Sequence, residues 1–130
     1  MELDAAPVDR ALLHALGKQC AQLLHDGNFD ALAKHFGYAV AFNRPLATAI
    51  EADLRIALTE AGASGLAASI DAQIGTTFFK PGQNLLAVVE CSLPTSDGGV
   101  VLAELVVTHQ DGRAWITLEE ISGQRDGLTA

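Results

Sequence analysis

The sequence has few cysteines and no long apolar run, and each shortage excludes a class of protein. Cys20 and Cys91 are the only cysteines, and both lie in apolar stretches without a metal-binding spacing. No apolar run approaches the roughly 20 residues that span a membrane. We therefore expect two small buried thiols in a reducing compartment, with no bound metal and no membrane span.

Positive charge is also scarce, because 8 Lys and Arg residues stand against 16 Asp and Glu residues and the net charge is −8. Proteins that bind nucleic-acid phosphates or anionic membranes need clustered basic side chains. This composition therefore argues against nucleic-acid and membrane partners. The basic residues are instead scattered along the chain, at Arg10, Lys18, Lys34, Arg44, Arg55, Lys80, Arg113 and Arg125.

Several signals of cofactor binding and targeting are absent from the sequence. There is no glycine-rich phosphate loop and no serine nucleophile elbow, and we expect no cofactor. Residues 1–9 carry three acidic residues and no Lys or Arg before Asp9, unlike a secretory signal. We expect a cytoplasmic protein.

The 130 residues suit one domain, 1–130, with a core at about 8–122 and a polar tail at 123–130. Hydrophobic residues make up 49% of the chain and charged residues only 18%. Because this is an apolar composition for a small protein, we expect a partner chain to cover part of its surface.

The first half of the chain has the period of helices. Apolar residues recur every three to four positions over 8–25, 29–36 and 45–61. Asp4 or Asp9 is the expected cap of the first helix. Residues 38–42, between the second and third helices, are a short strand candidate.

After Gly65 the apolar period changes from 3.6 to 2, which is typical of strands. Turn signals at 81–82, 96–99 and 111–112 divide this half into four expected strands, which short turns would join as an antiparallel meander. The predicted fold class is α+β, with three N-terminal helices packed on a curved, mostly antiparallel four-to-five-stranded sheet. The expected strands are 66–79, 84–93, 99–109 and 113–121.

The last predicted hairpin places two glutamates opposite each other. Asp111-Gly112 between alternating strands indicates a two-residue turn. With this turn at the centre, Glu104 faces Glu119. Like charges directly opposed in a sheet are destabilising. We interpret the pair as either a wet surface feature or a functional site.

The order of elements resembles the nuclear-transport-factor-2-like superfamily, also called SnoaL-like or cystatin-like. The residues that carry the resemblance are 24–36, similar to the superfamily's helix–Gly-Asp–helix–Phe pattern, and the 111–113 turn. The resemblance covers nearly the whole chain, and it implies a cone-shaped molecule with a pocket between the concave sheet face and the helices. The superfamily includes isomerases, epoxide hydrolases, dehydratases, polyketide cyclases and members without catalysis.

The two faces of the predicted last hairpin leave two interpretations open. One face is almost purely apolar, as at Leu105 and Ile116, and the other carries Glu104 and Glu119. In the first interpretation the apolar face packs on the helices, and the glutamates lie in water or in a polar dimer interface. The resemblance implies the second, in which the glutamates line an apolar cavity and the apolar face packs on a second subunit.

In a dry cavity Glu104 and Glu119 would be catalytic candidates, because one pKa would rise and a protonated acid would sit beside an ionised base. Arg44 stands before Pro45 where the superfamily's isomerases keep a general-base aspartate, so their mechanism does not transfer. The ligand-binding candidates on this view are Cys20, Tyr38, Arg44, Val106, Trp115 and Thr117.

We therefore expect a small-molecule-binding domain with an apolar pocket for a small hydrophobic ligand. Its acids would suit isomerase, lyase or hydrolase chemistry, although the sequence leaves open whether the protein is an enzyme. The alternative is a non-catalytic dimeric binding or interaction module. A homodimer through the sheet is expected in either case.

Overall fold

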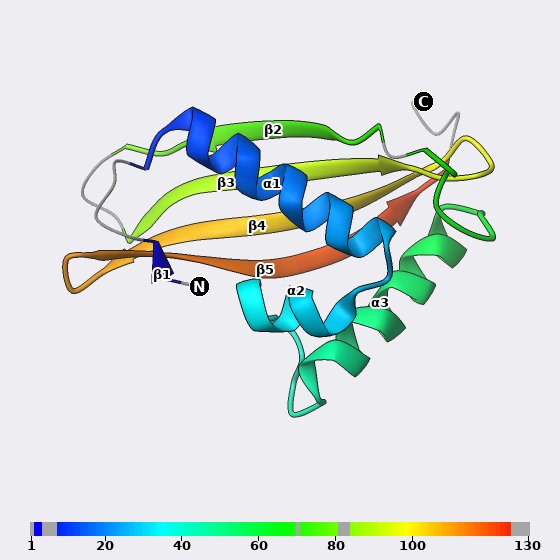
Figure 1. Cartoon of the computed structure of the whole chain (residues 1–130), viewed down its shortest axis with the longest axis horizontal. Helices are drawn as coiled ribbons and strands as arrows, with labels where there is room; N and C mark the ends of the chain where they lie inside the picture. The colour runs from blue at the N-terminus through cyan, green and yellow to red at the C-terminus, as the bar shows by residue number, and fades with distance from the viewer. Residues whose placement is uncertain (1, 4–7, 70, 81–83, 126–130) are drawn as a thin grey trace.

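The protein is described from a computed structural model, in which residues 2–3, 8–69, 71–80 and 84–125 are placed. Its helices are α1 (Arg10–His25), α2 (Phe29–Phe36) and α3 (Leu46–Glu60), and its strands are β1 (Glu2–Leu3), β2 (Gln73–Phe78), β3 (Leu85–Pro94), β4 (Val100–Gln110) and β5 (Arg113–Gln124). The strands form one antiparallel sheet in the order β1-β5-β4-β3-β2, with α1 lying across it (Figure 1). The predicted α+β class is confirmed, and the described residues contain three helices and an antiparallel sheet. The cone shape stays a prediction.

Side chains cap the first two helices, whereas α3 begins after Pro45 without a side-chain cap. Asp9 caps α1 by accepting a hydrogen bond from the Leu12 amide at 2.9 Å, and Asn28 does the same for the Ala31 amide of α2 at 3.3 Å. The alternative cap, Asp4, lies outside the described residues. No helix in the described part of the chain is long and apolar enough to span a membrane.

Gly17 lets α1 approach the sheet closely. A Cβ atom at this position would lie 2.7 Å from Ile74 Cγ2 on β2 and 3.0 Å from Val89 Cγ1 on β3. A glycine in the middle of a helix costs about 1 kcal/mol relative to alanine. The close packing of α1 on these two strands offsets that cost.

The short strand predicted at 38–42 is wrong beyond its first residue. Tyr38 makes one isolated parallel bridge to Leu118, and the Ala39 amide donates to the Leu118 carbonyl at 3.0 Å. The chain then turns, since Phe42 and Asn43 take φ values of 52° and 70°. Left-handed backbone of this kind cannot continue a strand.

The other strand predictions differ mainly at their ends. Regular pairing of the first long strand begins at Gln73, and Leu66 makes only an isolated bridge to Thr95. The pairing of β1 with β5 was not foreseen, because two residues carry no periodic signal. The predicted turn at 81–82 and the end of the predicted tail, 126–130, lie outside the described residues.

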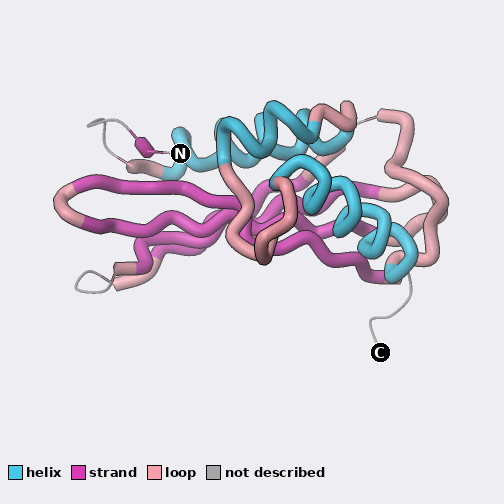
Figure 2. The backbone as a smooth tube through the Cα atoms, turned by 90° about the horizontal axis from the view of Figure 1, so that it is seen from below, coloured by secondary structure: helices cyan, strands magenta, loops and turns pink. Residues whose placement is uncertain are grey.

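The purely apolar face of the sheet packs on the helices. Val89, Leu105, Ile116 and Leu118 on this face are fully buried. The helices gather on one side of the sheet (Figure 2), and α3 packs against β5 (Figure 1). The first interpretation of the two faces is therefore correct for the single chain, and the second, with the glutamates turned toward the helices, is wrong.

The predicted pairing of Glu104 with Glu119 is also wrong. The expected register holds from Gln110–Arg113 to Leu105–Leu118, and then a bulge in β5 brings Glu120 opposite Glu104. Leu118 is buried and Ile121 also packs against the core, although the two are three residues apart. Because strand side chains alternate with a period of two, an extra residue is needed to turn both toward the helices.

Candidate functional site

The helix-free face of the sheet, which we call the open face, holds most of the predicted site residues. Residues that pair across antiparallel strands share a face, so the register defines its members. Six of them are apolar, and none of these six belongs to the core or packs against it within the described part of the chain. On β3 to β5 the open face comprises Leu85, Val88, Glu90, Ser92, Pro94, Val100, Leu102, Glu104, Val106, Thr108, Trp115, Thr117, Glu120, Ser122 and Gln124.

Three carboxylates cross the open face side by side. Glu90 on β3 pairs with Glu104 on β4, which pairs with Glu120 on β5. We call these three residues the glutamate row. Glu104 is half-buried and the outer two are exposed. Gly75 on β2 lies opposite Glu90 and adds no charge.

The surroundings of Glu104 disfavour its ionised form. Partial burial raises the pKa of the Glu104 carboxyl, and the charges of Glu120, Glu90 and Glu119 raise it further. Glu119 acts from its position as the extra residue in the β5 bulge. Sequence reasoning therefore found one of the three members of the row and missed the alignment of the other two.

Apolar side chains flank the glutamate row on both sides. Toward the β4–β5 turn, Val88, Val106 and Thr117 form the next cross-strand set. Beyond it, Trp115 is 36% exposed. Toward the opposite end, Leu102 lies between two serines. The open face thus carries apolar side chains, with serine and threonine among them, on both sides of an acidic stripe.

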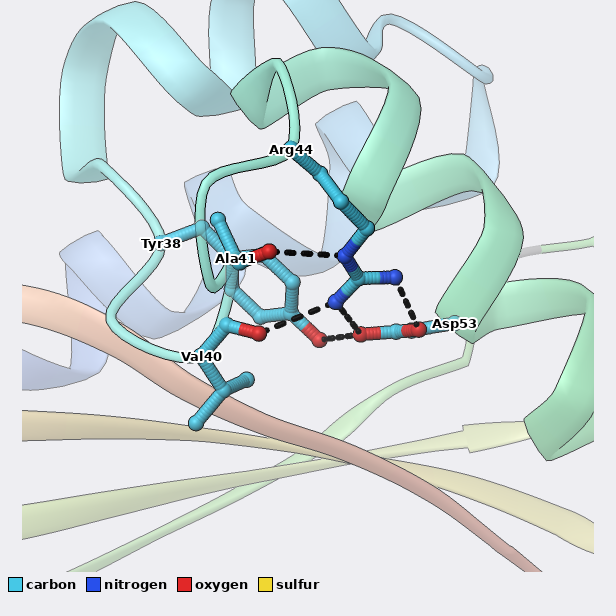
Figure 3. A network of polar contacts seen from close by, with 5 residues as sticks. All are labelled: Tyr38, Val40, Ala41, Arg44 and Asp53. Carbon is cyan, nitrogen blue, oxygen red and sulfur yellow. Dashed lines mark hydrogen bonds and ion pairs between the residues drawn. The ribbon is translucent and has the colours of Figure 1, made fainter.

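Arg44 and Tyr38, two predicted ligand-binding residues, belong instead to a polar cluster beside α3 (Figure 3). Arg44 Nη1 and Nη2 donate to the two carboxylate oxygens of Asp53 at 3.0 and 3.1 Å, and the Tyr38 hydroxyl donates to Asp53 at 2.5 Å. Arg44 also donates from Nε to the Ala41 carbonyl at 2.7 Å and from Nη2 to the Val40 carbonyl at 2.9 Å.

The polar groups of this cluster find their hydrogen-bond partners within it, which indicates a structural role. Arg44 holds the pKa of Asp53 below its usual range, and the Tyr38 hydrogen bond acts in the same direction. Burial, followed by the hydrogen bond to Asp53, raises the pKa of Tyr38. The sequence contained one sign that Asp53 is partly buried. Asp53 stands three residues after Ile50 and four before Ala57, so it lies on the apolar stripe of α3, where an acid needs a partner.

Cys20, another ligand-binding candidate, lies in the core between α1 and β3. Cys20 and Cys91 are both fully buried, as the sequence predicted, and both are free thiols. A hydrogen bond with Cys91 raises the pKa of Cys20, and burial adds to this. The Cys91 thiol donates to the Gly17 carbonyl at 3.5 Å. Buried thiols of this kind are inert.

The structure therefore divides the predicted site among three places. Glu104, Val106, Trp115 and Thr117 share the open face, with Glu119 in the adjoining bulge. Tyr38 and Arg44 bind Asp53, and Cys20 lies in the core. In the described part of the chain, no group of three or more His, Cys, Asp or Glu residues is placed to hold a metal ion.

Three shallow hollows lie away from Glu104. One of about 190 Å³ is lined by Lys18, Ala21, Gln22, Asp71 and Ala72. Another of about 260 Å³ separates the starts of α2 and α3. The third, of about 300 Å³, borders the Gly98–Gly99 turn at the end of the open face. A typical small-molecule pocket has a mostly apolar lining. The linings of these three hollows are mixed, and none of them includes Glu104.

No family model, curated protein or solved structure matches the chain. The resemblance to the nuclear-transport-factor-2-like superfamily and the expected cytoplasmic location stay predictions.

Proposed function

We propose that the protein is a non-catalytic binding module that works as a homodimer, with two chains packing their open faces together. The observation that supports this proposal is the set of apolar side chains left uncovered on that face: Leu85, Val88, Val100, Leu102, Val106 and Trp115. Apolar patches that the fold leaves partly exposed mark interaction sites in soluble proteins.

The size of the open face suits a second copy of the chain. The longest of its central strands, β4 and β5, have 11 and 12 residues. At about 3.3 Å per residue and about 4.8 Å between strands, four strands cover on the order of 600 Å² before side-chain relief is counted. An ordinary interface buries about 800 Å² per partner. Two sheets packed face to face would thus bury an area typical of a stable dimer.

A second copy also accounts for the composition of the chain. The helices already cover the purely apolar face, so the high apolar content is not explained by the core alone. A two-fold interface needs only one self-complementary patch, and the open face is the face of the sheet that the helices leave uncovered. The valine and leucine side chains on either side of the glutamate row suit close packing between sheets.

The dimer is tested by measuring association after a polar substitution on the open face. Val106→Asn adds no charge, and we expect it to weaken self-association at least tenfold in sedimentation equilibrium, a difference of about 1.4 kcal/mol. Ile56→Asn is the matched control, because Ile56 is 58% exposed on α3, away from the open face. A wild-type chain of 13.6 kDa at all concentrations, at both about pH 5.5 and about pH 7.5, would refute the dimer.

A second candidate function is the acid–base chemistry expected from the sequence, acting on a small hydrophobic ligand. The raised pKa of Glu104 favours it, because a carboxylic acid beside ionised neighbours can donate and accept protons. In the single chain, however, Glu104 lies on a face without a cover. This chemistry would therefore need the second subunit as its roof, and it depends on the same dimer.

A further inference from the structure

We infer that protonation of the glutamate row controls the pairing of two open faces, so that association is tight when the row is protonated and weak when it is ionised. This inference rests on the proposed function, because it concerns the same face. It goes further by naming the groups that regulate the dimer and the direction in which they act.

The position of the row makes it meet its own copy. Glu104 lies close to the middle of β4, and Glu90 lies close to the middle of β3. A two-fold interface places each patch against the same patch of the partner, so that a group at the centre faces its own copy. Two acidic rows would then cross where water is excluded from the interface.

The charges that act on Glu104 give it no compensation. Those that act on Glu104 all come from carboxylates, namely Glu90 on β3 and Glu119 and Glu120 on β5. At the β2 end of the row, Gly75 lies opposite Glu90 and carries no charge. At the β5 end, the charge of Glu120 acts on the hydroxyl of Tyr38, which is neutral. The partner subunit's row would add negative charge to a site that already disfavours it.

Among the described residues of β3 to β5, the basic side chain on the same face is that of Arg113, which lies far along the sheet. Arg113 starts β5 at the β4–β5 turn, on the side of the sheet that carries Trp115 and Thr117. Its Nε lies 3.4 Å from the Glu2 carboxylate, so it is already paired. The two cross-strand sets that flank the row consist of uncharged residues: Val88, Val106 and Thr117 on one side, and Ser92, Leu102 and Ser122 on the other. Pairing would thus desolvate the carboxylates without giving them counter-ions.

The sign of the pH effect follows from linkage. Because ionised rows repel each other, the pKa of Glu104, already raised in the single chain, is higher still in the dimer, and the dimer binds more protons. Association is therefore strongest at acid pH, and it weakens as pH rises above the ordinary glutamate value of about 4.3 and through the pKa of Glu104 in the dimer. Added salt screens the same repulsion, so it should strengthen association just as acid pH does.

The test is sedimentation equilibrium of the full chain at about pH 5.5 and about pH 7.5. We expect the wild-type dimer Kd to be at least tenfold larger at the higher pH. Glu104→Gln should lower the Kd at the higher pH and reduce this ratio to less than about threefold. Asp111→Asn is the matched control, since it removes one acidic charge at the exposed hairpin turn and leaves the row intact. Far-UV circular dichroism confirms that each variant is folded.

Each outcome separates the regulation from the dimer itself. A dimer with the same Kd at both pH values overturns the regulation and leaves the dimer standing. A pH effect that Glu104→Gln and Asp111→Asn alter equally also overturns it, because groups outside the row would then be responsible. A chain that stays monomeric at both pH values, with Glu104→Gln included, overturns the proposed function instead.

Discussion

At the scale of single residues, Asp53 organises the loop between α2 and α3. Its side chain is only 18% exposed and accepts hydrogen bonds from Arg44 and Tyr38. The loop that it holds contains Phe42 and Asn43 in left-handed backbone conformations. These conformations cost roughly 1–2 kcal/mol each for residues other than glycine. The Asp53 contacts thus hold a loop that would not keep its shape unaided.

We expect Asp53→Asn to lower the free energy of unfolding by about 2–3 kcal/mol, because hydrogen bonds to a charged group contribute about 1.5–3 kcal/mol each. Urea unfolding at neutral pH measures the change. Glu51→Gln on the same helix is the control, since its pair with Arg55 at 2.8 Å is exposed and should contribute less than about 0.5 kcal/mol. Equal effects of the two substitutions would contradict the structural role of the cluster.

The same pair gives a pH dependence of stability. Arg44 lowers the folded-state pKa of Asp53, so its contribution is fully present above the unfolded value of about 3.9 and is lost as pH falls through the folded value. The difference between the wild-type chain and Asp53→Asn should therefore shrink below about pH 4.

At the scale of elements, α3 and β5 touch where the strand has no side chain. A Cβ atom at Gly123 would run into the Ala57 carbonyl group, and the Gly123 amide donates to Glu60 Oε1 at 3.1 Å. The nearest atoms belong to backbone, which cannot rotate out of the way. The end of β5 and the helix are therefore fitted to each other through a glycine.

We expect Gly123→Ala to destabilise the chain by about 2–3 kcal/mol, because a methyl group forced into a packed contact moves the backbone. Thermal unfolding followed by circular dichroism measures the loss. Gly65→Ala is the matched control: its added Cβ would meet open space, so it should be neutral or stabilise by up to about 1 kcal/mol. Similar melting temperatures for the two variants would show that the close contact is not required.

At the scale of the whole molecule, one sheet has two faces with different tasks. Leu105 is fully buried against the helices, and its neighbour Val106 lies on the open face. The first face supplies the core of the chain. The second, with its acidic stripe and apolar flanks, is the face to which we assign the pairing of chains. Adjacent residues on β4 therefore serve folding and association separately.

We expect Leu105→Asn to unfold the chain or cost about 3–5 kcal/mol, because it buries an unpaired amide and removes core packing. Val106→Asn, one residue away, should leave the free energy of unfolding of the single chain within about 1 kcal/mol. Urea unfolding at a protein concentration below the dimer Kd compares them. If the two cost the same, the assignment of the faces would be wrong.

The helices, the antiparallel meander and the turn at Asp111-Gly112 could be predicted because each depends on local pattern. Apolar spacing and caps act over a few residues, so they mark α1, α2 and α3 within the sequence itself. The alternation of β4 and β5 likewise showed that the sheet has one purely apolar face. The burial of Cys20 followed from its place on the apolar stripe of α1.

The site depended on contacts that no local pattern contains. The spacing of Leu118 and Ile121 requires a bulge only because both must reach the same helices, and that bulge replaces Glu119 with Glu120 opposite Glu104. From the sequence alone, Arg44 and Tyr38 were ligand-binding candidates. Only the packing of α3 brings Asp53 to them. Local propensity selects elements, whereas burial of apolar surface among distant segments decides which side chains meet and which face stays open.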